Sequence, residues 1–128
     1  MIKILFFLLF SGYAYSQSVS WSEKVLIPTA TINGNSKSAT FAFTSSSGFA
    51  LQTDITCPGA CTVTVTVSGS VDGVTYTAIP ELTKTYTVTT NSLFNVYSQH
   101  FKWMKVTVAE TSTANATIKT ILGTKFQI

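Results

Sequence analysis

The sequence predicts an all-β protein, an antiparallel, jelly-roll-like β-sandwich of eight to ten short strands that follow an N-terminal apolar segment. Three observations lead to this fold class. Apolar residues alternate with Thr and Ser through most of the chain, which is the two-residue period of a half-buried strand. Turn residues recur about every 8–12 positions, as they do in sandwiches and barrels. After residue 16, no stretch of about a dozen residues carries the apolar stripe of a helix.

The N-terminal segment MIKILFFLLFSGYAYS has the build of a secretory signal peptide. A lone lysine comes first, an apolar run follows it, and the small residues Ala14 and Ser16 precede a cleavage point at about Gln17. The run is shorter than the roughly 20 apolar residues that a helix needs to span a bilayer. We therefore expect residues 1–16 to be a signal peptide and residues 17–128 to be a single β-sandwich domain. The alternative is a short retained membrane anchor, with its tyrosines at the membrane interface.

The expected strands are the runs in which apolar and polar residues alternate. They centre on residues 40–44, 51–55, 62–68, 102–108, 116–122 and 125–128. In TVTVTVS, the residues Val63, Val65 and Val67 share one face and the threonines share the other. In TFAFT, Phe41 and Phe43 share a face that we expect to be core. β-Branched residues suit such pleated, half-buried surfaces.

The dipeptide Asp72-Gly73 is the clearest turn signal between two alternating runs. It predicts a type I′ hairpin turn, which requires positive φ at both central residues. Val63–Val71 and Val74–Ile79 are then antiparallel neighbours. A metal site at Asp72 would need several further oxygen ligands, and the sequence places no acidic residue close by to supply them.

The two cysteines, Cys57 and Cys61, flank the turn residues of CPGAC. An even pair in an exported chain indicates a disulfide, and Pro58 and Gly59 let the chain fold back to form it. Only three residues separate the cysteines, so the bridge stiffens a loop rather than the whole domain. A redox motif has two intervening residues, and no further cysteine completes a zinc site.

Ionisable residues are few, and this argues against catalysis. His100 is the one histidine, and no serine lies in the context of a nucleophile. The acidic residues are Glu23, Asp54, Asp72, Glu81 and Glu110. No motif pairs two of them for acid–base work, and no glycine-rich phosphate loop is present. We therefore expect no enzyme, no cofactor and no metal. All basic residues are scattered lysines without arginine, so we also expect no nucleic-acid binding.

The aromatic residues offer a weak candidate interaction surface. In KWMKVTV, Trp103 and Lys105 alternate with Met104 and the valines. If the methionine and valines face the core, Trp103 lies outside between lysines, where large apolar groups are usually covered by a partner. We take Trp103, Lys105, Tyr76 and Lys102 as the candidate surface. Exposed Trp and Tyr serve both glycan binding and subunit contacts; the alternative is that Trp103 belongs to the core.

The order of features after Ser68 resembles small β-sandwich proteins of tailed and other bacteriophages, and more loosely the discoidin-like sandwich. SGSVDGVTY matches their S-x-DG-x-x-W hairpin, with Tyr76 in place of the usual Trp. FKWMKV, residues 101–106, matches their aromatic-basic strand, with lysines in place of arginines, and Gly123 matches the end of the closing strand. The resemblance covers about half of the chain. It implies a sandwich used in virion assembly, capsid decoration or surface attachment, and it carries over no catalytic residue.

Together these features predict a non-enzymatic structural protein, a phage virion component such as a capsid or tail accessory, decoration or spike protein. Its expected partners are other virion proteins or further copies of itself, with a membrane contact through residues 1–16 if that segment is retained. The alternative is an exported bacterial surface module that binds glycan or protein. The expected location is accordingly the virion, or the cell surface or medium after signal cleavage at about Gln17.

Overall fold

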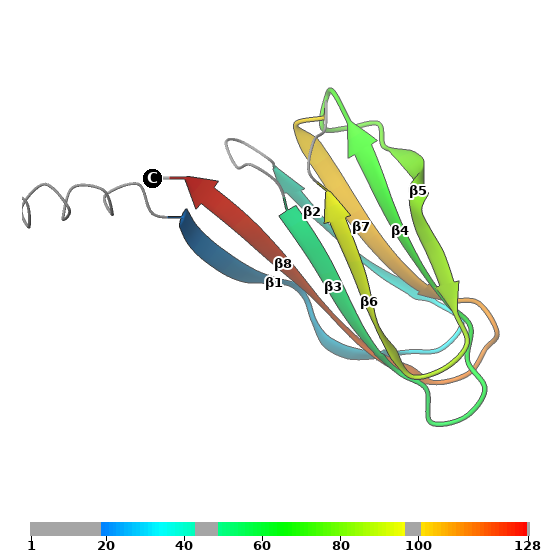
Figure 1. Ribbon diagram of the computed structural model, residues 1–128. Coiled ribbons are helices and arrows are strands. Elements are labelled where there is room, and N and C mark those ends of the chain that lie inside the picture. Colours follow the sequence, from blue (N-terminus) through cyan, green and yellow to red (C-terminus); the bar gives the residue numbers. More distant parts are fainter. Residues whose placement is uncertain (1–18, 43–48, 97–100, 128) are drawn as a thin grey trace, which may run out of the picture.

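The computed structural model describes residues 19–42, 49–96 and 101–127. Eight strands run through these ranges: β1 (Val19–Ile32), β2 (Ser36–Ala42), β3 (Phe49–Thr56), β4 (Val63–Ser70), β5 (Thr77–Tyr86), β6 (Thr90–Val96), β7 (Trp103–Glu110) and β8 (Ala116–Gln127). They form two sheets packed face to face (Figure 1). The predicted all-β sandwich and its strand number are therefore confirmed.

Several sequence-based expectations lie outside the described residues. These are the signal or anchor segment 1–16, the cleavage point at Gln17, the core position of Phe43 and the environment of His100. Within the described ranges, no helix is long and apolar enough to cross a membrane.

The strands follow the order of a jelly roll. One sheet has the order β1-β8-β3-β6 and the other the order β2-β7-β4-β5, and all neighbours are antiparallel. Among the described strands, every connection crosses between the sheets except the one from β4 to β5. That hairpin contains Asp72-Gly73, so the predicted antiparallel pairing of these two segments is confirmed.

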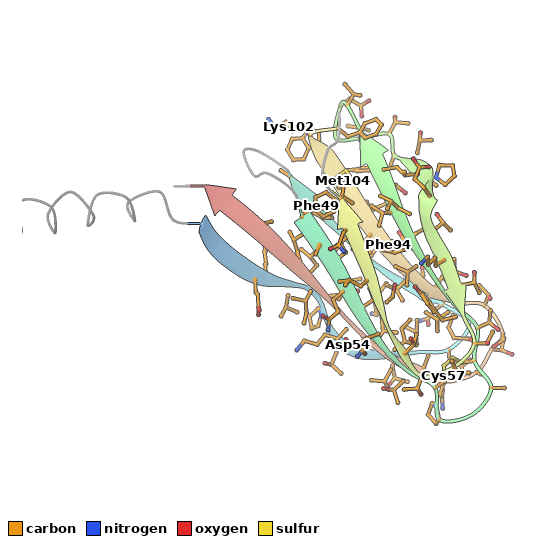
Figure 2. The ribbon with its side chains drawn as sticks, viewed as in Figure 1. Phe49, Asp54, Cys57, Phe94, Lys102 and Met104 are labelled. Atoms are coloured by element: carbon orange, nitrogen blue, oxygen red, sulfur yellow. A yellow bond between two sulfur atoms is a disulfide. The ribbon has the colours of Figure 1, made fainter. Side chains whose placement is uncertain are left out.

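The core forms where the apolar faces of the two sheets meet. Val63, Val65 and Val67 on β4 are fully buried, and Met104 and Val106 on the neighbouring strand β7 face the same core, as the alternation predicts. Figure 2 shows Met104, Phe49 and Phe94 between the sheets. β4 lies between β7 and β5, so its Thr/Val ladder is paired on both sides rather than left as an edge.

The turn between β4 and β5 differs from the predicted type I′ turn. The last paired residues are Gly69 and Thr77, so the connection spans residues 70–76. Gly73 has a φ of 77°, whereas Asp72 is not among the described residues with positive φ. The prediction of a two-residue turn was wrong because the side chains of Ser70 and Asp72 bond the local backbone and favour a wider loop.

Two of the four sheet edges carry features that discourage the addition of another strand. β1 contains two register shifts against β8, between Val25 and Ile27 and between Ile27 and Ala30, and Pro28 lies in the second. β5 contains Pro80, which has no N–H to donate. Bulges and prolines are the usual protection of edge strands, so contacts with other molecules at these edges are disfavoured.

Candidate functional site

The four residues of the predicted interaction surface lie close together at one end of the sandwich. Trp103 and Lys105 alternate with buried residues on β7 and are half-buried on the outer face of their sheet. The Nζ atom of Lys105 is 5.0 Å from the ring centroid of Tyr76, and that of Lys102 is 5.2 Å from a ring centroid of Trp103. Both separations suit cation–π attraction. Figure 2 shows Lys102 at this end and Cys57 at the other.

Trp103 lies on the outside of its sheet, and the β4–β5 loop covers part of its ring. A Cβ atom built on Gly73 would be 3.2 Å from both Cε2 and Nε1 of Trp103. Gly73 therefore serves two purposes: it adopts a φ of 77° and it lets the loop backbone approach the indole closely. The β4–β5 loop and the side chain of Lys102 thus cover part of the surface of the Trp103 ring.

The carboxylate of Asp72 fixes the conformation of this loop. Its Oδ1 atom accepts hydrogen bonds from the backbone N–H groups of Thr75 (2.9 Å) and Val74 (2.8 Å) and from the hydroxyl of Ser70 (2.9 Å). These bonds, with that from Thr75 the largest contribution, lower the pKa of Asp72 to about 2. The carboxylate is therefore ionised at neutral pH, and its Oδ2 atom makes no hydrogen bond to any described residue.

An open hollow of about 430 Å³ lies beside this loop, and we call it the tip hollow. It is lined by Gly69, Ser70, Val71, Asp72, Thr75, Thr77 and Phe101. The ring of Phe101 lies directly against Gly69: a Cβ atom there would be 2.6 Å from Cδ2 of the ring. Sequence reasoning overlooked Phe101 as a site residue, although it adjoins the predicted Lys102–Trp103 pair.

The outer face of the other sheet carries an apolar patch. Val25 lies opposite Ile121 in the β1–β8 ladder, and the same row continues through the exposed Gln52 of β3 to Leu93 of β6. Val25 is 49% exposed and Leu93 is 54% exposed. One row along, Gly123 lies opposite Ala50, and these small residues leave a hollow of about 270 Å³. We call Val25, Ala50, Leu93 and Ile121 the outer patch.

The end of the sandwich opposite the tip hollow is organised by Glu110, which sequence reasoning missed as a site residue. Its Oε1 atom accepts hydrogen bonds from the N–H groups of Gly34 (3.3 Å), Ser112 (3.0 Å) and Ala114 (3.0 Å). Its Oε2 atom accepts from the N–H of Thr62 (2.8 Å) and from the Ser112 hydroxyl (2.6 Å). One carboxylate thus joins the β1–β2, β3–β4 and β7–β8 connections.

Glu110 is buried, with 2% of its surface exposed. Burial raises the pKa of Glu110, but the hydrogen bonds from Ser112, Thr62 and the other donors outweigh it and lower the pKa from 4.5 to about 2. A signal for this role exists in the sequence. In the alternation of β7, Glu110 falls on the same inward face as Met104, Val106 and Val108. A carboxylate at such a core position needs hydrogen-bond donors around it.

The predicted disulfide is confirmed and lies at the same end as Glu110. Cys57 and Cys61 are bonded, with their Cα atoms 5.7 Å apart. The backbone of Cys57 also donates to the Thr89 hydroxyl and accepts a bond from it, which ties the loop to the β5–β6 connection. Figure 1 shows the four connections β1–β2, β3–β4, β5–β6 and β7–β8 together at this end. Covalent and polar links therefore stiffen it.

No protein-family model and no curated sequence matches the chain. Solved structures do match it. The structure of Bacillus endospore appendages, a family of disulfide-linked pili, has a TM-score of 0.52 and 15% identity over 88% of this chain and 91% of that one. The SPBc2 prophage-derived protein YomS has a TM-score of 0.52 and 10% identity over 83% and 95% of the two chains.

A chain of the T13 IBDV viral particle also has a TM-score of 0.52, with 9% identity over 88% of this chain. The present chain spans about a third of that protein, since 32% of it is covered. The fold is a jelly-roll β-sandwich. It is shared with these viral, prophage-derived and appendage proteins, and at such low identity the likeness extends to the fold alone.

Proposed function

We propose that the protein is a non-enzymatic structural component of a phage virion, a capsid or tail accessory protein that assembles with copies of itself or with other virion proteins. The observation that carries this proposal is the outer patch. Large apolar patches rimmed by polar residues are typical of contacts between proteins, and the outer patch has members on all four strands of one sheet, with Glu23 and Gln52 among them. The shared jelly-roll fold is consistent with this use and supports it only at the level of architecture.

Two of the four edge strands are poorly suited to contact with another protein, whereas a sheet face is available. Proline or bulges interrupt the ladders at the outer strands β1 and β5, which disfavours strand addition there. The outer patch, in contrast, presents exposed apolar side chains beside a shallow hollow at Gly123 that is lined in part by Glu23 and Gln52. Packing of one sheet face on another protein buries this area.

The rigidity of the sandwich suits an assembly role. The Cys57–Cys61 bridge and the Glu110 network hold the loops of one end, and Asp72 and Gly73 hold the hairpin at the other. A surface that does not rearrange loses less conformational entropy when it binds a neighbour. Stiff loops at both ends therefore favour repeated, identical contacts.

The association state of the purified protein tests this proposal. We expect analytical ultracentrifugation to detect self-association that Leu93→Asp weakens at least about tenfold, because a buried unpaired carboxylate is costly. Val88→Asp is the matched control, since Val88 is 65% exposed in the β5–β6 connection and outside the patch. An equal effect of the two substitutions would argue against the outer patch as the interface.

The location of the protein tests the virion assignment separately. We expect quantitative mass spectrometry of purified particles to detect the chain at a fixed copy number relative to the major coat protein. Absence from particles, together with presence on the surface of the producing cell, would support the alternative of an exported surface module.

A further inference from the structure

We propose that the tip hollow is a binding site for one pyranose ring of a neutral saccharide. The proposal is independent of the outer patch and of assembly, because the hollow lies at one end of the sandwich, against β4, β5 and Phe101, whereas the outer patch lies on the other sheet. Its volume of about 430 Å³ lies in the range of small-molecule sites. It combines an apolar wall with residues whose oxygen groups have no hydrogen-bond partner among the described residues.

The apolar wall is the ring of Phe101. The glycine at position 69 lets this ring lie directly on the β4 backbone, because any side chain there would displace it. Phe101 retains 36% exposure, so part of its ring remains open to a ligand. The C–H groups of a pyranose form a flat apolar face that stacks on such a ring, and Val71 adds a further apolar contact at the rim.

The polar wall offers acceptors and donors for sugar hydroxyls. Asp72, Thr75 and Thr77 line the hollow. The Oδ2 atom of Asp72 and the hydroxyls of the two threonines make no hydrogen bond to any described residue. The Ser70 hydroxyl, in contrast, is already engaged with Asp72 and Gly73. Three oxygen groups without a partner among the described residues, beside one ring, match the mixed apolar and hydroxyl character of a hexose.

The site is held in place before any ligand arrives. Three hydrogen bonds to Oδ1 of Asp72 orient its carboxylate, and the contact of Gly73 with Trp103 anchors the loop that carries it. Pre-organisation of this kind reduces the entropy that binding costs. The rings of Trp103 and Tyr76, the aromatic residues to which the sequence draws attention, face lysine amines, so Phe101 is the ring that remains available at this end.

The carboxylate sets the expected specificity. Asp72 is ionised at neutral pH and lines the hollow, whereas Lys102 and Lys105 do not line it. Neutral sugars therefore gain a charge-assisted hydrogen bond from their hydroxyls, and acidic sugars meet a like charge. A single ring bound this way is expected to have a Kd on the order of 1 mM, since a ligand of this size has few atoms to contribute.

Saturation-transfer difference NMR on the full chain tests the site, because it detects millimolar binding. The probes are methyl α-D-glucopyranoside, methyl α-D-mannopyranoside and methyl β-D-galactopyranoside, with methyl β-D-glucuronide as the charged comparison. We expect signal from at least one neutral glycoside and a signal at least about fivefold weaker from the glucuronide. No signal from any of the three neutral probes, or an equal signal from the glucuronide, would overturn the proposal.

Two variants assign the signal to the tip hollow. Phe101→Ala removes the stacking wall and is expected to abolish the signal. Thr77→Val keeps the shape of an exposed strand residue, removes one hydroxyl, and is expected to weaken binding about tenfold. Val88→Ala, in the β5–β6 connection, is the control and should retain the full signal. Unchanged binding in a folded Thr77→Val protein, with its amide shifts otherwise native, would place any sugar contact elsewhere and refute the assignment.

Discussion

Substitution of Gly73 by alanine tests how the β4–β5 loop is held. At a φ of 77°, a Cβ atom costs about 1–2 kcal/mol in left-handed backbone. The same atom would lie 3.2 Å from Cε2 and Nε1 of Trp103, which is tighter than ordinary van der Waals contact, so the indole must shift. We therefore expect Gly73→Ala to lower the free energy of unfolding by about 1–2 kcal/mol and the Tm by roughly 5–10 °C.

The matched control is Gly59→Ala in the disulfide loop. A Cβ atom on Gly59 meets nothing within 4 Å, and its φ is not in the left-handed region. Alanine there should be neutral or stabilise by up to about 1 kcal/mol, because it restricts the unfolded chain. Urea unfolding at 25 °C, followed by tryptophan fluorescence, gives both free energies. Equal stability of the two variants would refute the contact between Gly73 and Trp103 as the anchor of the loop.

Three further substitutions test the other end and the core. Because the pKa of Glu110 falls from 4.5 to about 2 on folding, its stabilisation is complete above pH 4.5 and is lost as the pH falls towards 2. Glu110→Gln should therefore lower the Tm strongly at pH 7 and much less at pH 3. If calorimetry finds the same decrease in Tm at both pH values, the reasoning is contradicted. Replacing Cys57 and Cys61 by serine should lower the free energy of unfolding in urea by less than about 3 kcal/mol, because the closed loop is short. A larger decrease would mean that the disulfide stabilises more than its own loop. Val65→Ala should lower the free energy of unfolding by about 2–3 kcal/mol in the same assay, whereas Val88→Ala, at an exposed position, should change it by no more than about 0.5 kcal/mol. Similar changes in the two variants would show that β4 is not in the core.

Local periodicity was sufficient to predict strands such as β4 and β7 and their inward faces, but β1 and β6 were not among the expected runs. The alternation of Val63, Val65 and Val67 identifies a core-facing strand whichever neighbours it has, because side chains alternate across any strand. The strand order was not predictable, since it depends on pairing between distant segments such as β1 and β8. For the same reason the donors of Glu110, which come from three connections, cannot be read from the residues around it.

The prediction of a tight turn at Asp72-Gly73 was wrong for a different reason. The dipeptide Asp-Gly favours a tight turn when only backbone geometry competes, but here Ser70 and Thr75 give the carboxylate local partners and Trp103 gives the glycine a place to pack. The prediction that Trp103 faces outward agrees with its alternation with Met104. That the loop covers part of the indole could not be foreseen, because it depends on the width of the same turn.

The position of β8 has a consequence for biosynthesis. The last strand of the chain lies between β1 and β3, so until it is made one sheet is divided into two parts that share no ladder. The nascent polypeptide cannot complete its hydrophobic interior while the ribosome still covers the final dozen or so residues. Cooperative folding of the sandwich is therefore postponed until β8 has left the ribosome.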